Sequence, residues 1–458
     1  MNIKFYHGLI ILACIALLLL SKFAWYAVFS AIAAALALWM LLRKQQVKYK
    51  KTYILSTLLL TGISCLFYYL FPVISIASPT GQYNVGITYR QFDTKRADHI
   101  TDTPNDYRTL YLKIWYPSNE SIDKKSTIDY MEGGKQTISE LVGHIGLPGF
   151  PFYPLLKTKT NSYLDLKPAT EIFPLVTFSH GYGLWPGSNT ALMEELASHG
   201  NVVVSIAHTY GASFGAVSSE EAIVFDTLID FTGGVALDSS FILSFTQAYE
   251  NPALKQSTYD SLQLILIEEG TFSNYLVREW ALDIQETIAH IISLNGTSNR
   301  QFPKIDTARI AATGMSMGGI AAVESTLLST KIKGALNMDG TQYGSLYKDT
   351  SDVPLLFFES DLDFEAVSIF DYFLDKSTQA VYRIKFKNAK HYNFTDASHI
   401  KILKFLGLNG EADASILEPL LHQIVLDYLA FLFDPTIDFD LEKYDSNPAV
   451  KSINQRKK

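Results

Sequence analysis

The sequence predicts an α/β domain with a mostly parallel central sheet and helices on both faces, preceded by N-terminal transmembrane helices. Two observations predict this class. Apolar runs fill the first 79 residues, and beyond them short buried strand-like runs alternate with helical patterns. We therefore divide the 458-residue chain into a membrane domain at 1–79 and an α/β domain at 80–458.

Three apolar runs make up the N-terminal part: Phe5–Leu20, Phe23–Leu42 and Thr52–Phe71. The second and third are long enough to cross a hydrocarbon core of about 30 Å. The first is shorter, and no small-residue cleavage signal follows Leu20 directly, so a removed signal peptide is the weaker interpretation. The sequence therefore predicts about three helices and a multi-pass protein of the cell membrane.

A basic loop predicts the orientation of these helices. Five Lys or Arg residues lie between Arg43 and Lys51, and loops of this kind remain in the cytoplasm. The helix from Thr52 then leads outward, so the α/β domain is expected on the extracytoplasmic side. That domain holds 46 acidic and 31 basic residues, a balance that argues against nucleic acid as a partner.

The expected elements of the α/β domain follow in chain order. Two or three strands fall within Tyr83–Ser118, where polarity nearly alternates. The later strands and helices are Phe173–Ser179 (strand), Ala191–Ala197 (helix), Asn201–Ala207 (strand), Glu279–Leu294 (helix), Ile332–Met338, Pro354–Phe358 and Ala380–Phe386 (strands) and Ile416–Phe433 (helix). The polar tail from Asp434 is expected to be frayed.

A single sharp turn carries the strongest functional signal. The apolar run Ile310–Ala312 leads into Gly314-Met315-Ser316-Met317-Gly318, and a stretch of small residues follows. A strand, a tight turn and a helix with one serine at the apex lift the hydroxyl clear of the sheet, and small flanking residues leave room for it. Ser316 is therefore the candidate nucleophile.

Candidate partners follow Ser316 in a fixed order. Asp339 ends one strand-like run, Asp361 ends the next, and His391 comes shortly after the third. Serine, acid and histidine in this order, each just after a strand, are typical of the α/β-hydrolase arrangement. His391 is favoured over His399 as the base because it directly follows the last strand, whereas spacing alone leaves both Asp339 and Asp361 open as the acid.

A candidate oxyanion site appears upstream. The strand Phe173–Ser179 opens into His180-Gly181-Tyr182-Gly183, and a His-Gly pair after the third strand of this fold supplies a backbone N–H to the nucleophile. Tyr182 is the expected donor there. Met317 follows the serine at a helix N-terminus, where the N–H and the helix dipole both favour an oxyanion.

These segments together resemble a known family. The runs Phe178–Gly183, Leu196–Gly200, Leu336–Asp339 and His391–Phe394, with the turn at Ser316, are similar to the platelet-activating factor acetylhydrolase family in its plasma and type II branch. The resemblance runs from about Tyr83 to about Phe394. It implies an α/β-hydrolase fold and a calcium-independent serine esterase that removes short or oxidised acyl groups from phospholipids. It also assigns Ser316 as nucleophile, Asp339 as acid, His391 as base, and Tyr182 and Met317 as oxyanion donors.

The resulting hypothesis is a membrane-anchored serine esterase acting on short-acyl or phospholipid-type esters, with an ester or lipid and the membrane as partners. A possible lid or insertion is expected at about 211–275, where the resemblance is weakest. No metal and no cofactor are expected, because no His, Cys or carboxylate spacing fits a ligand set, and both cysteines, Cys14 and Cys65, fall in predicted spans. The alternatives are a catalytically silent binding or membrane-organising module and, less favoured, a transporter component, since the spans carry no intramembrane charge.

Overall fold

The computed structural model describes residues 3–42, 50–97, 107–143, 145–209, 211–216, 222–224, 271–295, 302–340, 344–346, 349–361 and 377–456. Most of the predicted lid at 211–275 lies outside these residues, as does most of the basic loop at 43–51.

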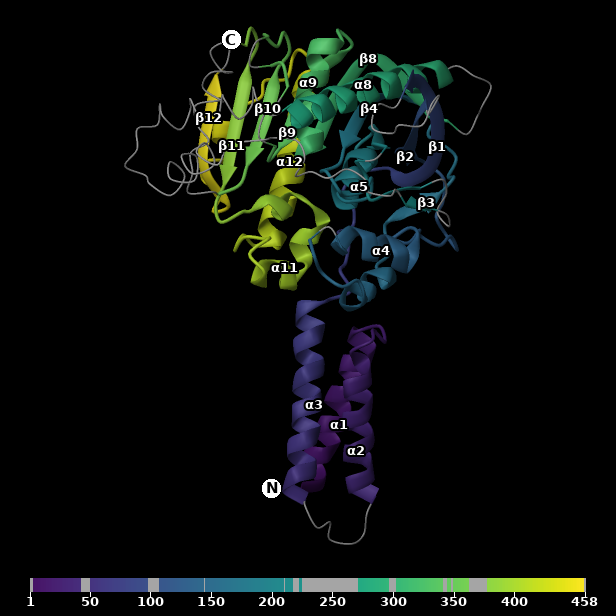
Figure 1. Cartoon of the computed structure of the whole chain (residues 1–458), viewed down its shortest axis with the longest axis vertical. Helices are drawn as coiled ribbons and strands as arrows, with labels where there is room; N and C mark the ends of the chain where they lie inside the picture. Colours follow the sequence, from purple (N-terminus) through teal and green to yellow (C-terminus); the bar gives the residue numbers. More distant parts are fainter. Residues whose placement is uncertain are drawn as a thin grey trace.

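Three helices form the N-terminal part, where three apolar runs were expected: α1 (Ile3–Leu20), α2 (Ala27–Leu42) and α3 (Lys50–Leu70). Figure 1 shows them as a stalk below the α/β domain, with the N-terminus at the far end. The expected span from Phe23 begins as a helix only at Ala27, because the chain reverses between α1 and α2. That turn touches the domain, since the Trp25 indole Nε1 donates to the Pro151 carbonyl at 3.2 Å.

The α/β domain is built on one ten-stranded sheet with the spatial order β12-β11-β10-β9-β8-β4-β5-β2-β1-β3. From β5 across to β11 all neighbouring strands are parallel, while β2 pairs antiparallel with both β1 and β5. Its strands are β1 (Asn84–Ala97), β2 (Tyr107–Ser118), β3 (Ser162–Leu164), β4 (Ile172–Ser179), β5 (Val202–Ala207), β8 (Lys304–Met315), β9 (Ile332–Met338), β10 (Leu355–Glu359), β11 (Val381–Phe386) and β12 (Val450–Arg456).

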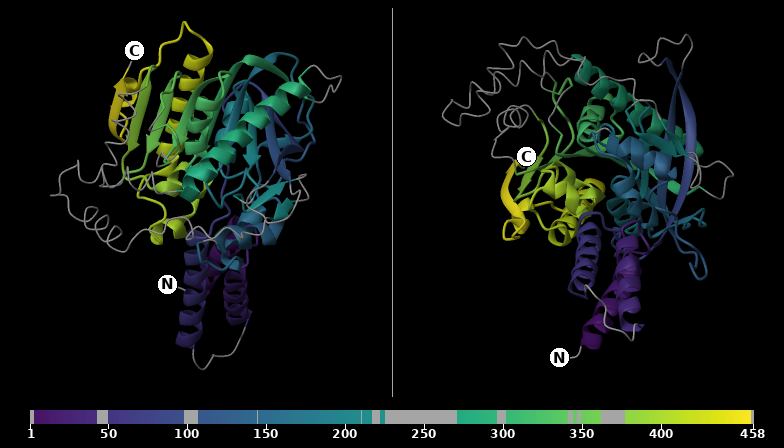
Figure 2. Two further views of the ribbon diagram at one scale, coloured as in Figure 1. Left: turned by 45° about the horizontal axis from the view of Figure 1, so that its top comes forward. Right: turned by 60° about the horizontal axis from the view of Figure 1, so that its bottom comes forward.

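Alternating side chains of the strands build two cores, one on each face of the sheet. Val202 and Val204 face a cluster with helices α8 (Thr271–Leu294) and α9 (Met317–Leu328). Val203, between them, faces the opposite cluster with α5 (Thr190–Ser198) and α12 (Ala414–Phe433). The period of two along each strand therefore places helices on both faces, as Figures 1 and 2 show. The expected mixed α/β architecture is confirmed.

Shorter elements complete the domain at the end nearest the stalk and at its margins. They are α4 (Gly134–Gly143), η1 (Phe150–Lys157), β6 (Phe214–Ala216), β7 (Ala222–Val224), η3 (His391–Phe394), η4 (Asp396–His399), α11 (Lys401–Phe405) and η5 (Leu441–Tyr444). A third apolar cluster joins α4, η1 and α11 beside the stalk, with Phe71 at the end of α3 packed against it. The Phe71 and Phe152 rings meet edge to face with centroids 5.3 Å apart.

Among the residues that the structure describes, two helices are long and apolar enough to cross a membrane by length and composition, α3 and α12. Helix α12 instead packs against the sheet, where Leu417, Ile424 and Tyr428 are buried. The expectation of a frayed tail after Asp434 is wrong. Strand β12 pairs antiparallel with β11 from Val450 to Arg456, because its main chain completes an edge that β11 would otherwise leave open.

Candidate active site

The turn at Ser316 has the geometry that its sequence predicts. Ser316 lies between β8 and α9 with φ 55° and ψ −126°, a backbone conformation that residues other than glycine seldom adopt. Its N–H donates to the Met338 carbonyl at 2.8 Å, which fixes the turn against the end of β9. A Cβ on Gly318 would overlap the carbonyl oxygens of Ser179 and His180, so this position accepts only glycine. The strained turn is therefore held by close packing on both sides.

Three polar side chains from separate strand ends meet at this turn. His391 Nε2 lies 2.9 Å from Ser316 Oγ, and His391 Nδ1 lies 2.7 Å from Asp339 Oδ2. The other Asp339 oxygen accepts from the Ser360 N–H at 2.7 Å, so both carboxylate oxygens have a donor. The His391 side chain is 42% exposed and that of Asp339 is 12% exposed, which leaves the imidazole open to a substrate while its partner is shielded.

The alternative residues lie elsewhere. Asp361 accepts from the Asn388 N–H at 2.7 Å and pairs with Lys451, so it ties the turn after β11 to β12. His399 contacts Glu418 at 2.7 Å. The structure thus brings His391 and Asp339, and neither Asp361 nor His399, to Ser316.

The predicted oxyanion segment lies beside the serine. Gly181 is so close to Ser316 that a Cβ there would lie 3.3 Å from Ser316 Cβ. Tyr182 follows Gly181 in this loop. Met317 is the first residue of α9, so its N–H belongs to the helix turn that has no acceptor within the helix. The two predicted donors therefore border the nucleophile from two different segments.

An apolar pocket of about 60 Å³ is lined by Leu184, which follows the His180–Gly183 loop in the chain, and by Tyr392, which follows His391. Phe152 and Leu403 line it toward the stalk, and Ser316, Asp339 and His391 are not part of its lining. A larger hollow of about 660 Å³ lies at the other end of β4, with His199 and Arg309 in its wall, and it does not reach Ser316. The larger hollow is therefore not the candidate site, although its volume is greater.

The chemistry of the site rests on these side chains. Within the described ranges, no group of three or more His, Cys, Asp or Glu residues converges as a metal site would require. A serine hydroxyl bonded to an imidazole, which is itself bonded to a carboxylate, is the arrangement that activates serine for acyl transfer.

Sequence reasoning missed one supporting residue. Asn337 holds the loop after β9 because its side chain accepts from the Gly340 N–H and donates to the Gly340 carbonyl, both at 2.9 Å. This loop carries Asp339, whose φ is 59°. The sequence contains one indication of this role. An asparagine within an apolar strand, just before Asp339, is typical of a side chain that hydrogen-bonds the main chain of the turn that follows it.

Comparisons with known proteins show which sequences this chain is similar to. The family described as "Platelet-activating factor acetylhydrolase, isoform II" matches residues 70–223, a segment that contains His180–Gly183 and ends before Ser316. The acetylhydrolase of Gallus gallus is 23% identical over 73% of this chain and 80% of that protein. The acetylhydrolase of Cavia porcellus is 24% identical over 78% of this chain and 77% of that protein.

A solved structure shows the same fold. The ferulic acid esterase from Streptomyces cinnamoneus superimposes with a TM-score of 0.60 at 19% identity, covering 81% of this chain and 98% of that one. The comparisons therefore confirm both the resemblance to the platelet-activating factor acetylhydrolase family and the expectation of an ester hydrolase.

Proposed function

We propose that the protein is a serine-dependent carboxylic-ester hydrolase in which Ser316 is the nucleophile, His391 the base and Asp339 the acid. The observation that carries this proposal is the continuous hydrogen-bonded chain from Ser316 Oγ through His391 to Asp339, with distances of 2.9 and 2.7 Å. Each residue follows a different strand, so the sheet fixes the positions of the three residues relative to one another.

In the proposed reaction, Ser316 Oγ attacks the ester carbonyl while His391 Nε2 takes its proton. Asp339 holds the imidazole in the tautomer with hydrogen on Nδ1 and stabilises the imidazolium that forms. The negative oxygen of the tetrahedral intermediate is stabilised by the N–H groups of Tyr182 and Met317. His391 then protonates the leaving alcohol. A water molecule, deprotonated by His391, releases the acid from the acyl-enzyme.

We infer that the substrates are short-acyl or phospholipid-type esters. The pocket beside Leu184 and Tyr392 has room for about four to six water-sized groups at roughly 10–15 Å³ each, which suits a short acyl chain. The acetylhydrolase relatives support the same choice.

We further propose that residues 1–79 form a membrane domain and residues 80–458 the catalytic domain. The stalk is apolar on the outside and polar within. Leu12, Leu55 and Leu59 are 62–68% exposed, whereas the Ser30 hydroxyl donates to Ser64 inside the bundle at 2.7 Å. Small residues line the inner face of α2, at Ala27, Ser30, Ala33 and Ala37. This distribution suits lipid and not water, because small residues allow helices to approach closely where lipid surrounds them.

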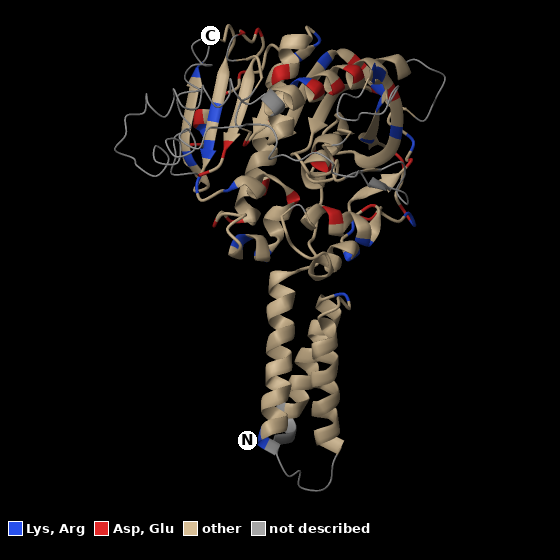
Figure 3. Cartoon of the chain, viewed as in Figure 1, with Lys and Arg blue, Asp and Glu red and all other residues tan. Residues whose placement is uncertain are grey.

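The charges of the stalk support a placement of the catalytic domain outside the cytoplasm. Figure 3 shows the stalk without charged residues between its two ends. The end of α2 and the start of α3, between which the basic residues lie in the sequence, are at the end of the stalk far from the domain, so a cytoplasmic basic loop leaves the domain on the opposite side.

A fluorophosphonate probe tests the catalytic proposal. The wild type should be labelled, and Ser316→Ala should lose labelling and lower the rate of ester hydrolysis by a factor on the order of 10⁶, the scale known for loss of a triad serine. Ser329→Ala, at the other end of α9, is the matched control and should retain both. If Ser316→Ala kept more than about a tenth of the activity, the nucleophile would lie elsewhere. An unlabelled wild type would favour a catalytically silent binding module.

The substrate class is tested by comparing vesicles of short-acyl, oxidised-acyl and long-acyl phospholipids with soluble nitrophenyl esters. We expect turnover of the short or oxidised acyl lipids. Inert phospholipids together with rapid turnover of soluble esters would remove the lipid assignment and leave the esterase assignment intact.

A further inference from the structure

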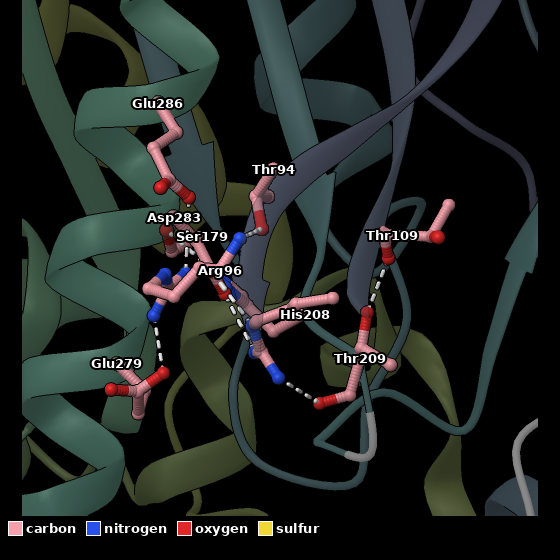
Figure 4. Close-up of polar contacts among 10 residues, drawn as sticks. Thr94, Arg96, Thr109, Ser179, His208, Thr209, Glu279, Asp283 and Glu286 are labelled. Atoms are coloured by element: carbon pink, nitrogen blue, oxygen red, sulfur yellow. Dashed lines mark hydrogen bonds and ion pairs between the residues drawn. The ribbon is translucent and has the colours of Figure 1, made fainter. Parts of the chain in front are cut away.

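A second Ser-His-Asp arrangement lies next to the candidate active site. Ser179 Oγ lies 3.0 Å from His208 Nε2, and His208 Nδ1 lies 2.8 Å from Asp283 Oδ2 (Figure 4). These distances are close to those around Ser316. All three residues have no exposed surface, so no substrate can reach this serine and the arrangement is not a second active site.

Two arginines fix the charge of Asp283. Arg108 donates to its two oxygens through Nε at 2.8 Å and Nη2 at 2.7 Å, and Arg96 contacts it as well. Burial alone would raise the pKa of Asp283, but the charge of Arg108 and the hydrogen bonds from His208 and Arg108 together outweigh it and hold the pKa well below its usual value. Asp283 is therefore ionised at neutral pH.

An ionised Asp283 determines the hydrogen positions of the other two side chains. Burial lowers the pKa of His208, so its imidazole is neutral. Its one hydrogen lies on Nδ1 and is donated to Asp283, which leaves Nε2 as an acceptor for the Ser179 hydroxyl. Trp280 stacks on the ring with centroids 4.0 Å apart and planes 6° apart, and so fixes its orientation.

This trio lies at the base of the loop that carries Tyr182. Ser179 is the last residue of β4, and the oxyanion loop His180–Gly183 follows it directly. The other end of the loop is held through the main chain that follows His208. The Gly211 N–H donates to the His208 carbonyl, and the Gly183 N–H donates to the Gly211 carbonyl, both at 2.9 Å. His208 thus restrains both ends of the loop.

The same segment touches the nucleophile turn. The carbonyls of Ser179 and His180 lie where a Cβ on Gly318 would be, so no space remains between the end of β4 and the first turn of α9. A displacement of Ser179 would therefore change the spacing between the donor on Tyr182 and the donor on Met317.

We propose that Ser179, His208 and Asp283 are positioning residues that hold the oxyanion loop at the distance from Ser316 that the tetrahedral intermediate requires. This inference rests on the proposed esterase function. The trio touches no reacting atom, and its effect passes through the main chain of His180–Gly183.

The test uses the full chain with two substitutions that break the contact to Ser179. Ser179→Ala removes the hydroxyl. His208→Asn keeps a donor near the Nδ1 position for Asp283 but has no atom at Nε2. We expect each to lower kcat by about tenfold to a hundredfold with KM unchanged, since complete loss of an oxyanion donor costs about a hundredfold to a thousandfold. His208→Gln, whose amide can reach the Nε2 position, should restore part of the rate.

A pair of substrates separates positioning from general damage. Sulfur is a poor hydrogen-bond acceptor, so a thionoester gains little from the oxyanion donors, whereas the matching oxygen ester gains fully. The variants should slow the oxygen ester much more than the thionoester. His199→Asn is the matched control, because it removes another histidine–carboxylate contact, to Glu195 at 3.1 Å, beside the hollow at the other end of β4. His199→Asn should change neither the rate with the oxygen ester nor the rate with the thionoester.

Three results would overturn the inference: full activity of Ser179→Ala, an equal loss on both esters, or a rise in KM at constant kcat. An inactive wild type would instead refute the esterase function itself. Thermal unfolding of each variant verifies that the compared proteins are folded, and Ser179→Ala, which removes one oxygen atom, is the variant least able to disturb the fold.

Discussion

The hydrogen bond between the Asp339 carboxylate and His391 depends on the backbone conformation of Asp339. Asp339 has a left-handed backbone conformation with φ at 59°, and the Ser360 N–H holds one oxygen of its carboxylate while His391 binds the other. Asp361, one strand farther along, points into the turn at Asn388 and toward Lys451. The two aspartates therefore have different partners although both follow buried strands.

Replacing each aspartate by asparagine distinguishes their roles. Asp339→Asn should lower kcat by a thousandfold or more, because an amide favours the wrong imidazole tautomer, at a cost of roughly 10⁴ in the chymotrypsin-type triad. Asp361→Asn should change kcat by less than about tenfold. Steady-state hydrolysis of one soluble ester by both variants provides the measurement, and the reverse pattern would transfer the role to Asp361.

The residues around Ser316 could be predicted from the sequence because each follows a strand-like run and the order along the chain is informative. The trio of Ser179, His208 and Asp283 could not. Its members are far apart in the sequence, and only the packing of α8 on the sheet brings them together. One signal was present. Asp283 is an acid on the apolar face of α8, between Trp280 and Ile284, and a buried acid requires a charged partner.

Helix α5 is held in place by two buried carboxyl groups. Asp396 accepts from the Thr190 N–H at 2.7 Å at the first turn of the helix, and burial raises the pKa of this carboxyl well above its usual value. Glu194, within the helix, accepts from the Asn161 N–H at 2.8 Å and the Asn161 side-chain amide at 2.9 Å, and also from Ser162. These bonds attach α5 to the start of β3, on the side of the sheet remote from α8.

The protonation of Glu194 should make the stability of this element depend on pH. Burial raises the pKa of Glu194 from 4.5 to about 7, so the folded state binds a proton that the unfolded state has released between these values. The contribution of the Glu194 proton to the stability of the folded state is complete below pH 4.5 and is lost as the pH rises through about 7. The free energy of unfolding of the wild type should therefore fall between about pH 4.5 and 7 relative to that of Glu194→Gln. Denaturant unfolding across this range measures the difference, and parallel pH profiles would contradict the prediction.

Strand and helix positions near the centre of the sheet matched their sequence patterns, because a buried parallel strand is a short continuous apolar run. The edge was harder to predict. Strand β12 reads Val-Lys-Ser-Ile-Asn-Gln-Arg, and this polar run is a strand only because β11 offers it a partner. Hydropathy likewise did not separate α3 from α12, since both are apolar and the difference lies in what each one packs against.

Across the whole molecule, the stalk and the domain differ in where their apolar side chains face. The domain buries its leucines between helices and sheet, whereas the stalk exposes them along its length. Trp25 and Phe71 join the two parts through η1, with Trp25 and Phe150 in edge contact at 5.8 Å. A stalk in lipid would therefore hold the apolar pocket beside η1 close to the membrane surface.

Cysteine labelling tests that placement. Cys65 is exposed on α3, whereas Cys14 is buried beside Thr61, so Cys14→Ala leaves a single exposed thiol. A membrane-impermeant maleimide should leave Cys65 unlabelled in intact cells, because lipid covers it, and should label it after denaturation. Adding Ser121→Cys on the exposed surface of the domain provides the control, and the thiol of this variant should react from outside. Labelling of Cys65 in intact cells would contradict a membrane-embedded stalk, and an unreactive thiol in the Ser121→Cys variant would contradict the orientation.

Strand β12 lies at the edge of the sheet beside β11, and side chains as well as its main chain hold it there. Lys451 pairs with Asp361, and the Gln455 side chain accepts from the Leu441 N–H at 3.0 Å. An exchange of this strand between two molecules would therefore have to rebuild these contacts as well as the main-chain ladder. Truncation before Val450 would remove that exchange and leave β11 as an open edge, along which molecules would associate without limit.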